Sequence, residues 1–62
     1  MRPLFAPGTL VAVRIFDDDD VEHELAPSMV VFAPEDVATD LYKVLTGRGL
    51  RDVPEWALRR LP

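Results

Sequence analysis

The 62-residue sequence contains no cysteine and a single histidine, His23. The lack of cysteine excludes disulfide bonds and thiolate metal sites, and one histidine is too few for the usual zinc ligand sets. A domain of this length buries only about 60% of the surface that its unfolded chain exposes. Its stability must therefore come from a compact apolar core, from self-association or from docking on a partner.

Long hydrophobic runs are also missing. No apolar stretch approaches the ~20 residues of a membrane span, and Pro3, Pro7 and Gly8 interrupt the apolar segment that an export signal needs. We therefore expect a soluble, cytoplasmic protein without a membrane partner. Hydrophobic residues nevertheless make up 48% of the chain, which is typical of an ordered globular domain and not of a disordered one.

Positive charge is scarce in the first two thirds of the chain. Residues 1–40 contain nine acidic side chains and two arginines, a balance of −7, whereas residues 41–62 contain five basic and two acidic side chains, a balance of +3. The overall charge of −4 argues against nonspecific nucleic-acid binding, which depends on a basic surface. The separation of charge fits head-to-tail contact between copies, closure of one half on the other, or two different partners.

Residues 9–33 form the predicted β-region, after an extended lead-in over residues 1–8. The segment 9–16 is dense in β-branched and aromatic residues and predicts the first strand. Aspartates 17–20 supply turn formers, so the following residues can return as a second strand until Pro27 ends it. A third strand is expected after this proline, where a nearly continuous apolar run suits a central position in the sheet.

The side-chain pattern also predicts the register of the first hairpin. A loop with an odd number of residues places Leu25 opposite Val13 and Glu24 opposite Arg14, so that apolar side chains share one face. An even loop would place glutamates on that apolar face. We therefore expect a turn of three or five residues, with Val13 in the core.

At Pro34 the periodicity changes. Pro34 and the two acidic residues after it suit a first helical turn. Apolar residues then recur at the spacing of one helix face: Val37, Leu41, Val44 and Leu45. The pattern predicts a helix over residues 34–46, with Leu41 in the core and Gly47 as the left-handed cap.

A second, shorter helix is predicted over residues 53–61. Asp52 and Glu55 stand three apart before an apolar group, which is a variant of the capping box, and Pro54 suits a first turn. The resulting fold class is α+β. It consists of a small antiparallel β-meander of two to three strands followed by two short α-helices packed on one face, in one domain over residues 1–62.

Acidic residues make up six of the eight positions from 17 to 24. Asp17 and Asp19 alternate like the first ligands of a calcium loop, but Ser28 stands where a bidentate glutamate is needed, so we expect no metal. Two interpretations of the cluster stay open. It is either a solvated turn that guards the edge of the sheet or a recognition surface for a basic partner.

No residue pattern in the sequence indicates a catalytic site. His23 lies between two glutamates without a nucleophile nearby, and Ser28, the only serine, has no elbow motif around it. We expect no enzyme and no cofactor. Trp56 allows two interpretations: it closes the core, or it lies with Leu58 and Leu61 on an exposed apolar face that anchors a partner.

The sequence thus predicts a non-catalytic protein-interaction module, an inhibitor or assembly factor that binds a protein with a basic surface through an acidic hairpin and an apolar C-terminal helix. Its expected partner-binding residues are Asp17, Asp18, Asp19, Asp20, Glu22, Glu24, Trp56, Leu58 and Leu61. One alternative is a self-associating homo-oligomer, a structural or minor subunit of a larger assembly such as a viral (phage) one. The other is a nucleic-acid binder that uses Arg48, Arg51, Arg59 and Arg60.

Overall fold

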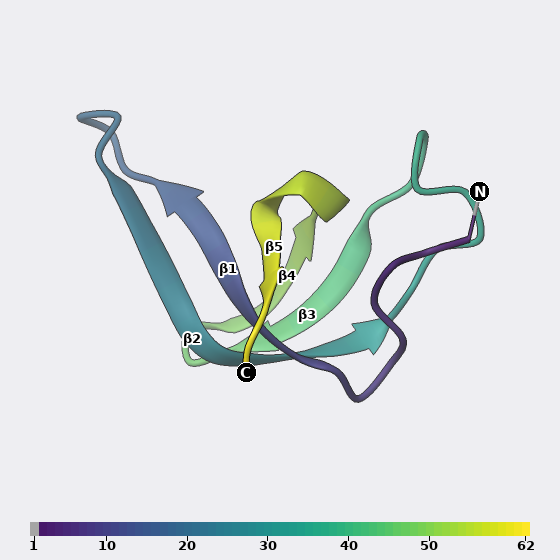
Figure 1. Ribbon diagram of the computed structural model, residues 1–62. Coiled ribbons are helices and arrows are strands. Elements are labelled where there is room, and N and C mark those ends of the chain that lie inside the picture. The colour runs from purple at the N-terminus through teal and green to yellow at the C-terminus, as the bar shows by residue number, and fades with distance from the viewer. Residues whose placement is uncertain (1) are drawn as a thin grey trace.

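The computed structural model describes residues 2–62 as one five-stranded antiparallel sheet (Figure 1). Its strands are β1 (Leu10–Phe16), β2 (Glu22–Phe32), β3 (Tyr42–Thr46), β4 (Gly49–Val53) and β5 (Leu58–Arg60). A 3-10 turn, η1 (Glu55–Ala57), is the only helical element in residues 2–62. The spatial order is β4-β3-β2-β1-β5, so β4 and β5 are the two edges. No helix in this part of the chain is long and apolar enough to cross a membrane.

The sheet is strongly bent, and the long strand β2 runs through both of its arms. In Figure 1, β1 and β2 rise together to the hairpin tip on one side, β3 rises on the other, and η1 lies in the opening between them. Two β-bulges interrupt the register of β2, one against β1 and one against β3. Bulges bend a strand and increase its twist, which gives the sheet a concave inner face and a convex outer face.

The hydrophobic core lies on the inner face. Phe5, from the segment before β1, covers it and packs edge-on against Tyr42, with 5.9 Å between the ring centroids. The amide of Gly8 donates to the carbonyl of Val30 at 2.7 Å and holds this segment to the sheet. The buried cluster is Phe5, Val11, Val13, Val30, Tyr42, Val44, Val53, Ala57 and Leu58.

The first hairpin has the predicted register. Val13 pairs with Leu25 and Arg14 pairs with Glu24, as an odd loop requires, and five residues separate Phe16 from its partner Glu22. Val13 is fully buried, which confirms its place in the core.

The predicted break between a second and a third strand is wrong, because β2 continues through Pro27. Val13 pairs with Leu25 and Val11 pairs with Ser28, so the extra residue of a bulge falls at this proline. A bulge leaves a backbone amide unpaired, and proline has none to pair. The Ala26–Pro27 peptide bond is cis.

The predicted helix over residues 34–46 is also wrong. The carbonyl of Asp36 accepts hydrogen bonds from the amides of Thr39 and Asp40, but this single helical turn does not continue. From Tyr42 onward, burial alternates with a period of two residues, as in a strand that is covered on one face. Leu41 is exposed and lies outside the core. The positive φ of the following turn falls at Gly49, and the expected cap at Gly47 is absent.

The second predicted helix, over residues 53–61, is reduced to η1 and the short strand β5. Residue Val53 still belongs to β4, and in the turn the amide of Ala57 donates to the carbonyl of Pro54 and the amide of Leu58 to the carbonyl of Glu55. Residues 58–60 instead pair with the open side of β1, because a helix of only two turns is marginal in water without packing. The α+β class is therefore incorrect, and the fold is all-β.

Candidate interaction surface

Asp17 organises the tip of the acidic hairpin. Its Oδ1 accepts hydrogen bonds from the amides of Asp19 and Val21, both at 2.9 Å, and its Oδ2 lies 2.9 Å from His23 Nε2. The bond to His23, followed by the amide of Val21, holds the pKa of the Asp17 carboxyl below its ordinary value. Asp20 closes the turn in the left-handed region with a φ of 63°. Asp17 is therefore engaged within the chain.

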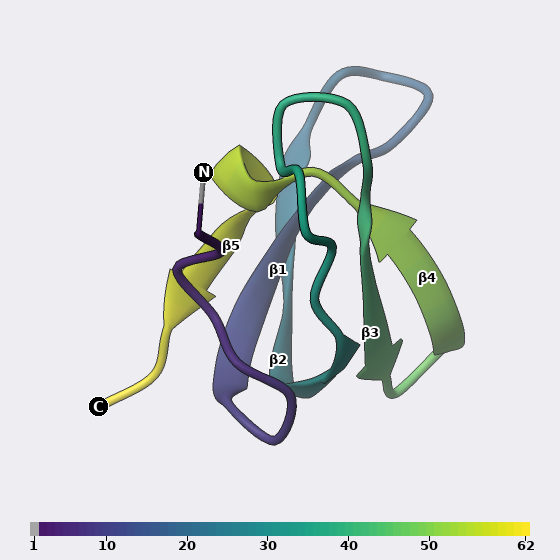
Figure 2. The same cartoon turned by 90° about the vertical axis from the view of Figure 1, so that its right-hand side faces the viewer.

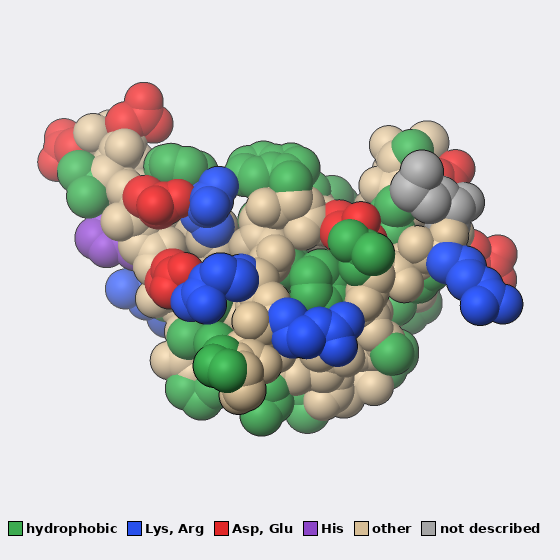
Figure 3. All heavy atoms as spheres, viewed as in Figure 1, with side chains coloured by type: hydrophobic (Ala, Val, Ile, Leu, Met, Phe, Trp, Pro, Cys, Tyr) green, Lys and Arg blue, Asp and Glu red, His purple; other side chains and the backbone are tan. Residues whose placement is uncertain are grey.

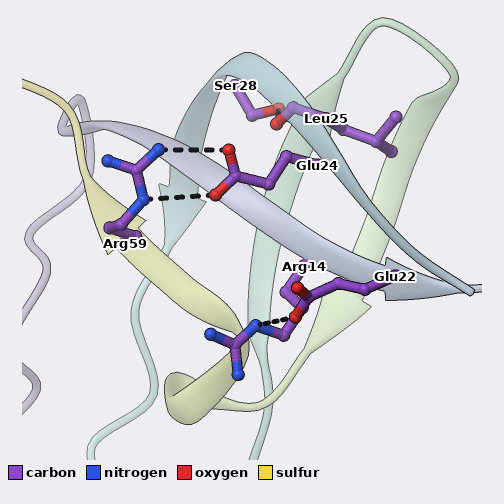
Figure 4. Close-up of polar contacts among 6 residues, drawn as sticks. All are labelled: Arg14, Glu22, Glu24, Leu25, Ser28 and Arg59. Atoms are coloured by element: carbon purple, nitrogen blue, oxygen red, sulfur yellow. Dashed lines mark hydrogen bonds and ion pairs between the residues drawn. The ribbon is translucent and has the colours of Figure 1, made fainter.

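Both glutamates of the acidic cluster are paired with arginines (Figure 4). Arg14 Nε lies 2.6 Å from Glu22 Oε1. Arg59 donates to both carboxylate oxygens of Glu24, at 3.2 and 3.1 Å, and this pairing lowers the pKa of Glu24 and raises that of Arg59.

The acidic residues that remain are Asp18, Asp19 and Asp20, whose side chains make no hydrogen bond or ion pair within residues 2–62. No set of three metal-ligating side chains occurs in the same residues. The free negative charge of the hairpin is thus confined to its tip.

The three predicted C-terminal anchors do not form one surface. Trp56 lies on η1 and is 68% exposed, so it does not close the core. Leu58 faces the inside of the sheet and is buried, while Leu61 is half-buried. Only Trp56 is available to a partner as an isolated apolar side chain.

The four arginines of the nucleic-acid alternative are divided between opposite edges of the sheet. Arg48 and Arg51 lie at β4, and Arg59 and Arg60 lie on β5, which Figure 2 shows on the other side of the molecule. Arg60 donates to the carbonyl of Leu4 at 2.9 Å. No single basic surface results.

A row of exposed apolar side chains, which the sequence analysis did not identify, crosses four strands of the sheet. Leu10 pairs with Met29, Met29 pairs with Leu45, and Leu45 pairs with Leu50, across four strands. Directly opposite residues on antiparallel strands point to the same face. The side chains are 53%, 37%, 48% and 58% exposed, in the order of the row. We call Leu10, Met29, Leu45 and Leu50 the outer-face row.

The row crosses the lower end of the sheet. Figure 3 shows hydrophobic side chains gathered along this lower edge, and Figure 2 shows β1, β2, β3 and β4 side by side there. Next to the row, Phe32 pairs with Lys43, and Lys43 Nζ lies 3.1 Å from Asp52 Oδ1. Exposed apolar patches rimmed by polar groups mark interaction sites on soluble proteins.

One pattern in the sequence could have predicted this row. In three strands, a residue of the row stands beside a buried valine: Leu10 before Val11, Met29 before Val30, and Leu45 after Val44. In a strand such neighbours point to opposite faces, so both faces become apolar.

On the inner face, Tyr42 and Glu55 join three segments of the chain. The hydroxyl of Tyr42 donates to the Glu55 carboxylate, which also accepts the amide of Leu4 at 3.1 Å. Burial, reinforced by the bond to Glu55, raises the pKa of Tyr42 above its ordinary value. No pocket opens in residues 2–62 beside this pair or elsewhere, and its geometry is that of a structural tie.

The chain matches no known family model, no curated protein and no solved structure.

Proposed function

We propose that the protein is a non-catalytic protein-interaction module that binds through the outer-face row. The observation that carries this proposal is the alignment of the four apolar side chains on directly paired positions of four strands. Neighbouring strands lie about 4.8 Å apart, so the row is continuous over roughly 14 Å. An isolated exposed leucine needs no explanation, whereas a continuous apolar strip is an interaction feature.

The surroundings of the row resemble the anatomy of a binding site. Stable protein interfaces have an apolar centre that excludes water and a polar rim that remains accessible. Here the Lys43–Asp52 pair borders the row on the side of β3 and β4, and the Glu24–Arg59 pair lies on the same face near β5. These charges are already paired, so covering the row leaves no isolated charge buried.

A second candidate is recognition of a basic protein surface by the hairpin tip. The free carboxylates of Asp18, Asp19 and Asp20 favour it, because unpaired charge attracts an oppositely charged partner and speeds its approach. The exposed apolar side chains that flank the tip, Phe16 and Val21, are not aligned on paired positions as those of the row are, because Phe16 pairs with Glu22.

Site-specific photo-crosslinking tests these proposals. A photoreactive amino acid is placed in turn at Leu45 in the row, at Asp19 in the tip and at Thr39, an exposed loop control. We expect a protein adduct from position 45, whether with another protein or with a second copy, and none from position 39. An adduct from position 19 alone would identify the hairpin tip, and not the outer-face row, as the binding surface. Absence of adducts from positions 45 and 19 would overturn both candidates.

A further inference from the structure

We propose that the surface covering the outer-face row is the same row of a second copy, packed face to face. This inference rests on the proposed function and names its partner. The row consists only of leucine and methionine side chains of similar size. Two sheets that pack face to face interdigitate such side chains at a spacing of about 10 Å.

The symmetry of the row suits pairing with itself. A two-fold interface brings the same patch of both copies together, so the patch must be complementary to itself. An axis parallel to the strands, between β2 and β3, places Leu10 of one copy against Leu50 of the other. The same axis places Met29 against Leu45. Every side chain of the row then meets an apolar counterpart.

The charges near the row allow this contact. Lys43 is paired with Asp52, and Arg59 with Glu24, within each copy. These paired charges do not repel their own image in a second copy. Neither pair offers an unpaired charge that a strongly acidic or basic foreign partner would recognise.

The net charge of −4 does not prevent two copies from packing through the outer-face row. Besides Glu35 and Asp40 in the loop between β2 and β3, the acidic side chains that make no hydrogen bond or ion pair within residues 2–62 are at the hairpin tip, which begins at Asp17, seven residues along the chain from Leu10. At the ~3.3 Å rise of a strand this separation is about 23 Å, which exceeds the Debye length of about 8 Å at physiological ionic strength. The charge of each tip is thus largely screened at the row.

The small core gives a reason for self-association. The largest fully buried side chains are one tyrosine, four valines and one proline. A chain this short covers a limited share of its apolar surface by itself, and oligomerisation is a common source of the missing burial. A second copy would cover the row without any other component.

Sedimentation equilibrium of the purified full chain tests the inference. We expect a species of twice the 7.0 kDa chain mass that dissociates on dilution. The substitution Leu45→Arg should leave only the monomer. Trp56→Arg is the matched control, because it adds the same charge at an exposed apolar side chain outside the row, and it should remain dimeric. Leu50→Arg, at the sheet edge, repeats the test if Leu45→Arg does not fold.

Three results would overturn the inference: a parent protein that is monomeric at all concentrations, a Leu45→Arg variant that folds and stays dimeric, or equal loss of dimer in the Leu45→Arg and Trp56→Arg variants. A monomeric parent that still forms a crosslink from position 45 to another protein would reject the second copy and retain the proposed function. A parent without association and without crosslinks would reject both.

Discussion

The inner and outer faces of the sheet are built from neighbouring residues of the same strands, yet they end in opposite environments. Val11, Val30 and Val44 are fully buried, while Leu10 and Leu45, one position away, are about half exposed. The inner face is closed by Phe5 and by the segment around η1. Within residues 2–62 no element covers the row on the outer face.

The comparison shows that apolar character alone does not define a core. A strand sends successive side chains to opposite faces, and the short connections of this chain can cover only one of them. The inner face therefore carries folding stability, and the outer-face row, which we propose as the association surface, is left uncovered within residues 2–62.

The largest expected effect is a difference between two adjacent positions, Val44 and Leu45. Val44→Ala removes fully buried methyl groups and should lower the free energy of unfolding by roughly 1 to 3 kcal/mol. Leu45→Ala should change it by less than about 0.5 kcal/mol in dilute, monomeric protein. Urea unfolding of both variants measures the difference, and equal losses at the two positions would break the comparison.

The second effect concerns Tyr42, whose hydroxyl lies at the inner face. Tyr42→Phe should cost about 1 to 2 kcal/mol at neutral pH, because Glu55 loses a partner. The raised pKa of Tyr42 means that stability is fully present below the ordinary tyrosine pKa of about 10 and is lost as pH rises above it. Unfolding measured across this window should show a smaller loss for Tyr42→Phe than for the parent; equal losses would contradict the role of the hydroxyl.

A smaller effect is expected at Asp17, which holds the hairpin tip. Its pKa is lowered first by the bond to His23, so its contribution to stability is present above the ordinary aspartate pKa of about 4 and is lost as pH falls below it. Carboxyl NMR titration should place the Asp17 midpoint below that range. His23→Gln should raise the midpoint, and an unchanged midpoint would show that the bond is unimportant.

The smallest effect is expected for the combined change of Asp18, Asp19 and Asp20 to asparagine. Asparagine tolerates the left-handed backbone of position 20, and Asp17 still holds the turn. The melting temperature and the dimer should be retained, while Asp17→Asn should lower the melting temperature. A triple variant that is less stable than Asp17→Asn would contradict the assignment of the turn to Asp17. A triple variant that loses the dimer would show that the tip takes part in self-association, which we assign to the outer-face row.

The sequence predicted the first hairpin because its information is local. β-Branched residues defined β1, and the need to keep Glu24 off the apolar face fixed the register opposite Arg14. The helix over residues 34–46 failed because adjacent Val44 and Leu45 fit one helix stripe as well as two faces of a strand. A single helical turn does form at Asp36, two residues after Pro34, but it does not continue.

The candidate site could not be predicted in the same way. Its members come together only through the pairing of Met29 with Leu45 and of Leu45 with Leu50, and the first of these pairs is distant in the sequence. The acidic cluster was visible from composition, and Arg14, the partner of Glu22, lies in the predicted hairpin. The ion pair of Glu24 with Arg59 depends on β5 lying beside β1, as the pairing of Ala12 with Arg59 shows.

The dependence of the melting temperature on protein concentration tests the central claim most directly. Association that occurs only in the folded state stabilises by mass action, so the melting temperature of the parent should rise with concentration. Leu45→Arg should remove this dependence, and Trp56→Arg should retain it. A parent melting temperature that stays constant over the full concentration range would contradict the assignment of the outer-face row to self-association.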